Sequence, residues 1–486
     1  MAFPNPMIVI HAILSWVPRA RRYEVSRPET LALFVPIFNE ESEIGETLQS
    51  VFNQTRLPQI ILLSENGSTD KTREVIERFL ADRGIRLSGK RWLNGVKIDE
   101  YLAPDSLIIV VKHEEKTSKA SSINFAKELL REVDRVMSID SDTRLTQRVF
   151  EILMNSFYEL RGGKKGDPYT LYQESMVAGL CRSRKQQNTG IIGELIHRAR
   201  CANHDVGQHL VRMGQNMTAG FTVSGCGYCI SSKDFGTQER TLTEDLDLTW
   251  TMETRDQTSI SLSLDEVRAM GLAVRAGNSE IPLREFLQDA GQTRVAMVMT
   301  NHVRYEQRAL LLPVTPGTIG GLYRQVNRWT RGFQQNLVVH NKSLFKNKKL
   351  AFVAFGFELT GIAGALWMLA LPILVASYYL TGFGINLLTA GLVVASEFAV
   401  QGGLIFLGAL SRHRTFGQRR IGVTCAAAFD ALCTLFPAYL YRWLLSPVFL
   451  GNVIRTLIER IGGGKSWNNS WVRPTERVRK AQPSTT

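Results

Sequence analysis

The sequence predicts an α/β domain followed by a region of membrane-embedded helices. Three observations support this fold class. Short aliphatic stretches alternate with helical stretches up to about Lys349, long apolar stretches dominate from Leu350 onward, and a basic amphipathic segment lies just before the change. Strands that alternate with helices favour a parallel sheet covered on both faces. A chain of 486 residues has room for two or three such units.

Four stretches rich in β-branched and aliphatic residues are the predicted strands: 31–37, 59–63, 107–112 and 135–139. Helical stretches at 71–83 and 121–131 separate them. In an open α/β sheet, ligands bind outside the carboxyl ends of the strands. The residues that follow each strand are therefore the first candidates for a functional site.

Polar clusters follow three of these strands: Pro36 to Glu41, Ser64 to Asp70, and Asp140 to Thr143. Each alone could be a plain turn or a solvated loop, but three at successive strand ends favour a site. Asp140 and Asp142 stand at i and i+2, so both carboxylates can point the same way. Such a pair suits a hard divalent cation that also takes diphosphate oxygens. A structural cap is the alternative for this pair.

A second acidic motif, Thr243-Glu244-Asp245, precedes a hydrophobic run. Adjacent acids can simply be favoured at a helix N-terminus by the helix dipole. The functional interpretation makes Asp245 a general base, ionised at neutral pH and held at an acceptor hydroxyl.

The segment 316–342 has the pattern of an amphipathic helix. Its apolar residues recur every three or four positions: Ile319, Leu322, Val326, Trp329, Phe333 and Leu337. The segment is basic and directly precedes the first apolar stretch, which predicts a helix in the membrane interface. Gln325, Arg328 and Trp329 lie on one side of this helix. An aromatic residue at this spacing, taken on its own, would be assigned to the core or to a membrane anchor.

Two membrane spans are predicted at about 352–379 and 385–411. The linker between them carries no charge, whereas basic residues flank the pair on its other side: Lys346, Lys348, Lys349, Arg412, Arg414, Arg419 and Arg420. The positive-inside rule therefore places the α/β domain in the cytoplasm. A third segment, about 421–457, is either one span plus an interfacial helix or a short hairpin, giving three or four spans. Residues 7–17 are too few to span and predict an interfacial anchor.

The net charge of +13 fits a basic protein against anionic lipid. No groove-facing basic helix or RNA-stacking motif supports nucleic-acid binding. Six cysteines in a chain of this length do not make a disulfide framework. Cys226 and Cys229 have CxxC spacing without a second pair, which argues against zinc and fits a reduced, cytosolic environment.

Taken together, these motifs resemble the family 2 glycosyltransferases, in particular the membrane-integrated branch with cellulose, chitin, hyaluronan and poly-N-acetylglucosamine synthases. The resemblance covers about 31–473 and implies a GT-A, Rossmann-like domain. It implies that the nucleotide is bound by residues from the strand ends: Pro36, Phe38, Asn39, Glu40, Glu65, Gly67, Lys119 and Asp140. Asp142 would hold a divalent cation, Mg²⁺ or Mn²⁺.

The same resemblance makes Thr243-Glu244-Asp245 the catalytic motif, with Asp245 as the base of an inverting transfer. Gln325-Val326-Asn327-Arg328-Trp329 matches the Q-x-x-R-W pattern of polymer-forming members. Gln325, Arg328 and Trp329 would hold the diphosphate and the acceptor sugar. Glu65 stands where the family usually has Asp, and the 80 positions between Asp245 and Gln325 include a surplus polar stretch.

The expected units are an interfacial segment 1–26, a glycosyltransferase domain 27–315 with an insertion at 256–293, interface helices 316–349, a transmembrane region 350–460 and a basic cytoplasmic tail 461–486. The expected function is transfer of a sugar from a nucleotide-sugar, with a UDP-sugar as the expected donor, to a growing polysaccharide.

Transfer of one or a few sugars to a lipid or protein acceptor is the alternative. A non-catalytic membrane scaffold is disfavoured because Asp140, Asp142 and Asp245 are all present. No complete span precedes the catalytic domain, so an additional membrane subunit could complete a translocation channel. The expected partners are therefore a nucleotide-sugar, a glycan or lipid-linked acceptor and the bilayer, without nucleic acid.

Overall fold

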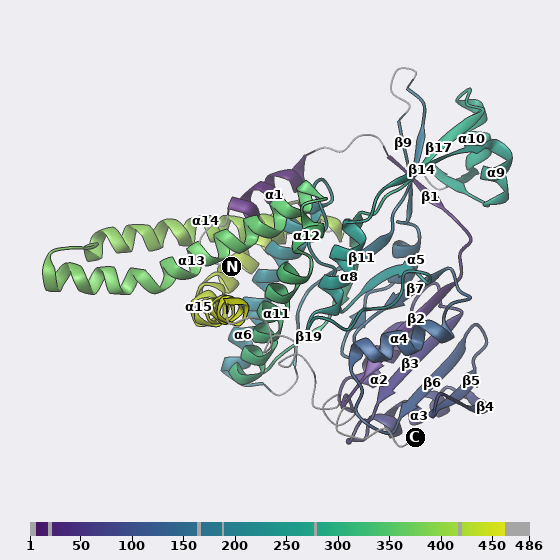
Figure 1. The fold of residues 1–486 in the computed structure, drawn as a ribbon, viewed down its shortest axis with the longest axis horizontal. Helices are drawn as coiled ribbons and strands as arrows, with labels where there is room; N and C mark the ends of the chain where they lie inside the picture. The colour runs from purple at the N-terminus through teal and green to yellow at the C-terminus, as the bar shows by residue number, and fades with distance from the viewer. Residues whose placement is uncertain are drawn as a thin grey trace.

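The computed structural model describes residues 6–17, 22–162, 167–186, 189–276, 279–416 and 420–461. Apart from Ile461, the predicted basic tail lies outside these residues. Figure 1 shows two sheet regions on one side of the molecule and, on the other, a pair of long helices that projects away from them.

A ten-stranded sheet forms the centre of the α/β domain, in the order β4-β5-β6-β3-β2-β7-β13-β11-β18-β8. Its central strands β6 (Leu107–His113), β3 (Ile60–Asn66), β2 (Leu31–Ile37) and β7 (Arg135–Ser138) are parallel. These four strands confirm the sequence prediction. The sheet as a whole is mixed. On one edge, β5 (Val96–Leu102) is antiparallel to β6, and β4 (Arg86–Leu93) is antiparallel to β5. On the other edge, β13 (Tyr228–Ser231) is antiparallel to both β7 and β11 (Met176–Cys181), β18 (Val303–Leu312) is parallel to β11, and β8 (Arg144–Leu145) is antiparallel to β18.

Helices cover both faces of this sheet, as its apolar strands require. Every residue of β2 is buried. Its Leu33 and Val35 pack toward α2 (Ile44–Phe52), α3 (Thr72–Asp82) and α5 (Val149–Met154). Its Phe34 packs toward α4 (Lys119–Leu129) and α8 (Glu244–Glu253).

A second sheet lies next to the first, and its strands β1, β9, β14 and β17 are labelled in Figure 1. Its order is β14 (Thr258–Ser263), β17 (Arg294–Met299), β10 (Thr170–Gln173), β9 (Tyr158–Arg161), β1 (Arg22–Ser26), β15 (Ala273–Ala276) and β16 (Ser279–Pro282). The polar stretch 256–293 supplies three of these strands together with α9 (Leu264–Ala269) and α10 (Leu283–Asp289). Strand β1 brings the start of the chain into the same sheet, a pairing that the sequence did not predict.

Long helices follow the sheets. α11 (Ile319–Val339) and α12 (Asn341–Leu344) lead into α13 (Lys348–Thr381) and α14 (Leu387–Thr415), which form the projecting pair in Figure 1. α15 (Arg420–Ile461) is one continuous helix, so a short hairpin in this segment is wrong. The described residues include three helices long and apolar enough to cross a membrane, judged by length and composition.

The remaining elements connect these parts. α1 (Pro6–Trp16) lies against α7 and α13, where a Cβ on Gly214 or Gly356 would meet His11 or Met7. The others are α6 (Ile191–Val206), the π-helix η1 (Gly207–Arg212), α7 (Met213–Gln215), β12 (Arg184–Lys185) and β19 (Val314–Thr315).

Candidate active site

The loops that follow β2 and β3 are tied to each other. Asn39 adopts a left-handed backbone with φ of 54°. Its amide N–H donates to the Ser68 hydroxyl at 3.0 Å, and its side-chain oxygen accepts from the Thr69 N–H at 2.8 Å. The two strand ends therefore form one rigid edge directly beside Pro36, Phe38 and Glu40.

The turn after β3 requires glycine. Gly67 has φ of 75°, and a Cβ there would lie 2.6 Å from the backbone of Glu115. Glu65 is fully buried, and its two carboxylate oxygens accept from the Ser68 N–H and from Arg73. Glu65 thus braces the turn from within, and its contact with a base stays a prediction. The Lys116 ammonium lies 4.1 Å from the centroid of the Phe38 ring.

Three carboxylates gather beside this edge. Burial, followed by the charge of Asp140, raises the pKa of Asp142 to about 7. Burial, followed by the charges of Asp142 and Asp140, raises the pKa of Glu40 to about 8. Like charges at close range disfavour ionisation, and a cation between them would reverse that effect. This group of acids therefore has the electrostatics of a cation site.

Within the described residues, no three Asp, Glu, His or Cys side chains meet closely enough to hold a metal ion by themselves. This arrangement still fits Mg²⁺ or Mn²⁺ bound with a substrate, because such ions usually take one or two protein carboxylates together with phosphate oxygens. The donor set of Asp140 and Asp142 meets that requirement.

Lys119 connects the two acidic motifs. Its ammonium lies 2.6 Å from the carboxylate of Asp140 and 3.2 Å from that of Glu244. It also donates to the Gly225 carbonyl at 3.3 Å. Burial opposes the ionisation of Glu244, but the charge of Lys119, a backbone hydrogen bond and the charge of Arg328 together outweigh burial and lower the pKa of Glu244. Residues more than a hundred positions apart in the sequence thus meet at one ammonium group.

Asp245 is held by backbone amides. Its carboxylate accepts from the Gly225 N–H and from the Leu246 N–H, each at 2.9 Å. Burial and the neighbouring Glu244 raise the pKa of Asp245 to about 6. The group is therefore ionised at neutral pH and still close enough in pKa to accept a proton, as a general base requires.

Helix α11 docks directly on this motif. Thr243 accepts a hydrogen bond from the Asn336 amide at 3.0 Å. A Cβ on Gly332 would lie 2.5 Å from the Thr243 side chain, so the close approach requires glycine. The docking brings Arg328 near the acids, where its charge helps to lower the pKa of Glu244.

The other two residues predicted on α11, Gln325 and Trp329, lie on the same helix as Arg328. Trp329 is 36% exposed, and the Arg200 guanidinium lies 4.7 Å from its ring centroid. The buried side-chain oxygen of Gln325 has no hydrogen-bond partner among the described residues. Trp329 therefore has ring surface, and Gln325 a side-chain oxygen, available for a further contact.

Some contacts at the site carried no sequence signal. Arg184 pairs with Glu43 at 2.5 Å and donates to the Asp142 carbonyl at 3.3 Å, which fixes the loop after β7. Gly225 was not predicted either, and a Cβ there would lie 3.1 Å from the Asp245 carboxylate. Cys226 lies 2.7 Å, sulfur to sulfur, from the buried Cys181.

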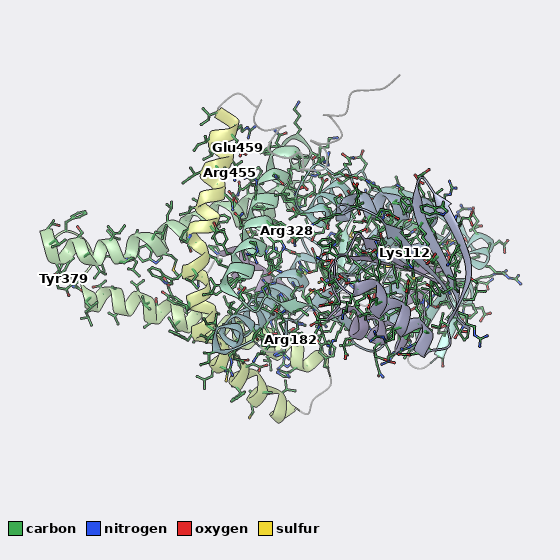
Figure 2. All side chains as sticks on the ribbon, turned by 90° about the horizontal axis from the view of Figure 1, so that it is seen from below. Lys112, Arg182, Arg328, Tyr379, Arg455 and Glu459 are labelled. Atoms are coloured by element: carbon green, nitrogen blue, oxygen red, sulfur yellow. The ribbon has the colours of Figure 1, made fainter. Side chains whose placement is uncertain are left out.

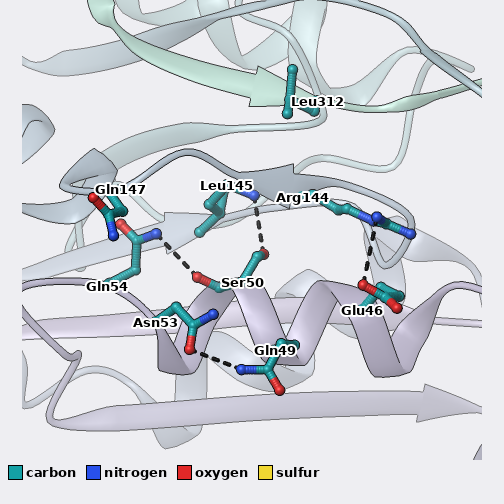
Figure 3. Close-up of a pocket in the computed structure, with 9 residues that line it drawn as sticks. All are labelled: Glu46, Gln49, Ser50, Asn53, Gln54, Arg144, Leu145, Gln147 and Leu312. Carbon is teal, nitrogen blue, oxygen red and sulfur yellow. Dashed lines mark hydrogen bonds and ion pairs between the residues drawn. The ribbon is translucent and has the colours of Figure 1, made fainter.

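A surface hollow between α2 and β8 lies next to the loop that carries Asp142 (Figure 3). In it, the Ser50 hydroxyl accepts from the Leu145 N–H at 3.0 Å, and the Gln54 amide donates to the Thr146 carbonyl at 2.8 Å. These contacts anchor β8, the strand that begins just after Asp142. The hydrogen bonds in this hollow therefore fix the strand that follows Asp142, whereas Glu40, Asp140 and Asp142 do not line the hollow.

Comparison with known proteins agrees with this geometry. Residues 32–163 match the sequence profile of the family described as Glycosyl transferase family 2. Over these residues the chain is similar to that family. The match ends before Asp245 and α11, so it covers the nucleotide-side motifs and leaves the other half of the site to the structure. The α/β domain has a GT-A fold with mixed sheets and is followed by long apolar helices.

Solved structures similar to this chain include the mannosyltransferase PcManGT from Pyrobaculum calidifontis in complex with GDP-Man and Mn²⁺. It has a TM-score of 0.45 and 12% identity over 88% of this chain and 95% of that chain. S. aureus TarS 1–349 has a TM-score of 0.30 and 11% identity over 85% of this chain and 91% of that chain. No curated protein sequence matches the chain.

Proposed function

We propose that the protein is an inverting glycosyltransferase that moves a sugar from a nucleotide-sugar, preferably a UDP-sugar, to a growing polysaccharide at the cytoplasmic face of a membrane. The observation that carries the proposal is the meeting of Asp140 and Glu244 at Lys119, with Asp245 beside them. We call the loops after β2, β3 and β7 the nucleotide half of the site. The Gly225 loop, the start of α8 and α11 are the acceptor half.

In the nucleotide half, Pro36, Phe38, Asn39 and Glu65 face the nucleoside, and the edge built by the Asn39 hydrogen bonds keeps them in place. Asp142, with Asp140, would hold a divalent cation that neutralises charge on the departing diphosphate. The raised pKa values of Asp142 and Glu40 support this assignment, because a cation would relieve the repulsion that raises them.

In the acceptor half, Asp245 is the general base. The acceptor hydroxyl oxygen attacks the anomeric carbon, the bond from that carbon to the diphosphate breaks, and Asp245 takes the hydroxyl proton. The Gly225 and Leu246 amides fix the carboxylate for this role. Arg328 stabilises the diphosphate, while Lys119 holds Asp140 and Glu244 at a fixed separation. Positioning of this kind accounts for a large part of the lowering of the barrier.

Acceptor binding falls to Trp329 and Gln325. The exposed part of the Trp329 ring offers an apolar face on which a sugar ring can stack, and Arg200 holds the ring in place. The unpaired oxygen of Gln325 can accept from a sugar hydroxyl. A platform of this kind, on the helix that carries Arg328, supports extension of a glycan chain.

The experiment uses the full chain in nanodiscs with a panel of UDP- and GDP-sugars and Mg²⁺ or Mn²⁺. Nucleotide release and product size are read together, with Asp245→Asn as the inactive variant and the exposed Asp82→Asn as a matched carboxylate control. Metal-dependent release with a high-mass ladder is expected. Release with only small or lipid-extractable product would replace polymer synthesis by single transfer, and no release with any donor would contradict the proposal.

A further inference from the structure

Helix α15 runs across the hairpin of α13 and α14 instead of alongside it. Figure 1 looks along α15 while the hairpin lies in the plane of the picture, and Figure 2 shows α15 upright with the hairpin horizontal. In Figure 2, Tyr379 marks the far tip of the hairpin, whereas Arg455 and Glu459 mark one end of α15. Two such directions cannot both lie along one membrane normal.

One face of α15 stays on the catalytic domain over most of its length. Near its start, Asp430 pairs with Arg182 at 3.5 Å. In its middle, Tyr441, Leu445 and Val448 pack on α6 and α11. Further along, Asn452 donates to Asn327 at 2.9 Å. Near its end, Glu459 pairs with Arg331 at 3.2 Å.

These contacts decide the orientation. They extend over about 30 residues, or roughly 45 Å of helix. The partner helices α6 and α11 carry many charged side chains, including Glu194, Arg198, Arg324 and Arg328. Helices of that composition do not enter the hydrocarbon layer. A helix that contacts them over such a length cannot cross that layer.

The opposite face of α15 is apolar and uncovered. Its exposed large side chains recur at helical spacing from one end to the other: Phe429, Leu432, Phe436, Leu440, Leu444, Ile454, Leu457, Ile458 and Ile461. A long continuous apolar stripe of this kind on a helix marks a lipid-facing surface. We call these nine residues the α15 stripe.

We infer that α15 lies flat in the cytoplasmic interface of the membrane, with the α15 stripe toward lipid, and that only α13 and α14 cross the bilayer. The occupant of this surface is thus the bilayer itself. The inference rests on the membrane attachment in the proposed function but not on its chemistry. The third long apolar helix then supports the catalytic domain instead of forming a span.

The length of the hairpin fits this arrangement. α13 meets α15 at Gly361, where an added Cβ would lie 3.0 Å from the ring of Phe449. From Gly361 to the end of α13 at Thr381 is about 20 residues, or roughly 30 Å. That length matches a hydrocarbon core of about 30 Å. On α13, the part of the hairpin beyond Gly361 is therefore long enough to cross the bilayer.

Charge and continuity support the same plane. α1 lies on the hairpin at Gly356, with Ile13 63% exposed and Trp16 under the Arg414 guanidinium at 5.0 Å. Exposed lysines stand at the base of α13: Lys346, Lys348 and Lys349. Basic side chains at the membrane surface are attracted to anionic headgroups. We therefore place α1, α15 and these lysines at the same membrane surface, around the base of the hairpin.

The test measures the depth of single probes in the bilayer. In a Cys425→Ala, Cys433→Ala background, where the other four cysteines are buried, Cys is placed at Phe429, Phe436, Leu444 or Ile454 and labelled with a bimane fluorophore. Quenching is compared in nanodiscs whose lipids carry bromine near the headgroup or near the acyl end. Leu366, Ile373 and Leu380 on α13 are the matched positions on a spanning helix.

We expect the four α15 positions to be quenched alike and mainly by the shallow bromine, whereas the α13 positions differ in depth and Ile373 responds most to the deep bromine. A graded series along α15, deepest at Phe436 and Leu444, would overturn the inference. Absence of quenching at all seven positions would also overturn the inference, because none of the labelled residues would then contact lipid. Sugar transfer measured on the same samples would show separately whether the proposed chemistry holds.

Discussion

The nucleotide half and the acceptor half of the site are built in different ways. The nucleotide half comes from neighbouring parallel strands, and its acids are crowded: besides burial, Asp142 and Asp140 raise the pKa of Glu40, and Asp140 raises the pKa of Asp142. In the acceptor half, Asp245 is pinned by backbone amides from the Gly225 loop and from its own helix. The nucleotide half thus suits the binding of a cation, and the acceptor half suits the acceptance of a proton.

This difference explains why Lys119 lies between the halves. It pairs with Asp140 on one side and Glu244 on the other. Its charge favours the ionised forms of Glu244 and Asp245, and its ammonium stands between the negative charges of the two halves. The comparison predicts that the two halves fail in distinguishable ways when single residues are replaced.

The largest effect is expected for Asp245→Asn. Loss of a general base typically costs about 10²- to 10⁴-fold in rate, so kcat should fall within this range while nucleotide binding is retained. Because the pKa of Asp245 is raised to about 6 and the base must be ionised, wild-type kcat/KM should fall as pH drops through about 6. Steady-state nucleotide release between pH 5 and 8 measures both. A variant that keeps wild-type turnover would remove Asp245 from the mechanism.

Replacement of Lys119 by Met should have the next largest effect. The substitution keeps the length of the side chain but removes the charge that favours the ionised forms of Glu244 and Asp245. The pKa of both acids should rise, so the acid limb of the pH–rate profile should move to higher pH. One pKa unit corresponds to about 1.4 kcal/mol, or tenfold at pH values below the limb.

Lys119→Arg is the control for that prediction, because it restores the charge and should restore the position of the acid limb. A merely structural role for Lys119 would lower the rate without moving the limb.

A smaller effect is expected where α11 docks on Thr243. In Gly332→Ala the new methyl would lie 2.5 Å from the Thr243 side chain, so the helix must shift. Overpacking of this kind typically costs about 1–3 kcal/mol and should lower the thermal inactivation midpoint and raise KM for the acceptor. Gly320→Ala, on the same helix, meets only the Arg324 guanidinium at 3.6 Å and should leave both unchanged. Equal behaviour of the two variants would contradict the docking.

The nucleotide half could largely be predicted from the sequence. Strands 31–37 and 107–112 and the polar residues after them follow from local composition, and parallel strands bring such residues to one edge. The two predicted spans likewise correspond to α13 and α14.

The acceptor half could not be predicted in the same detail, because its contacts join distant segments. Nothing near Asp245 in the sequence identifies Gly225 as its partner, and Gly332 looks like an ordinary helical glycine until Thr243 is seen against it. The second sheet has the same origin, since β1 pairs with β9 and β15 from two remote parts of the chain. Hydropathy also could not orient α15, because an interfacial helix and a span of similar composition differ only in what they contact.

The most direct test of the account compares metal-dependent binding of UDP to the wild-type protein, Asp142→Asn and Asp245→Asn by isothermal titration in nanodiscs with Mn²⁺. We predict that Asp142→Asn loses the metal-dependent part of the affinity, whereas Asp245→Asn binds UDP as the wild type does but releases no nucleotide from the donor. Equal loss of binding in both variants, or unchanged metal-dependent binding in Asp142→Asn, would contradict the division of the site into a half that holds the nucleotide with its cation and a half that takes the proton.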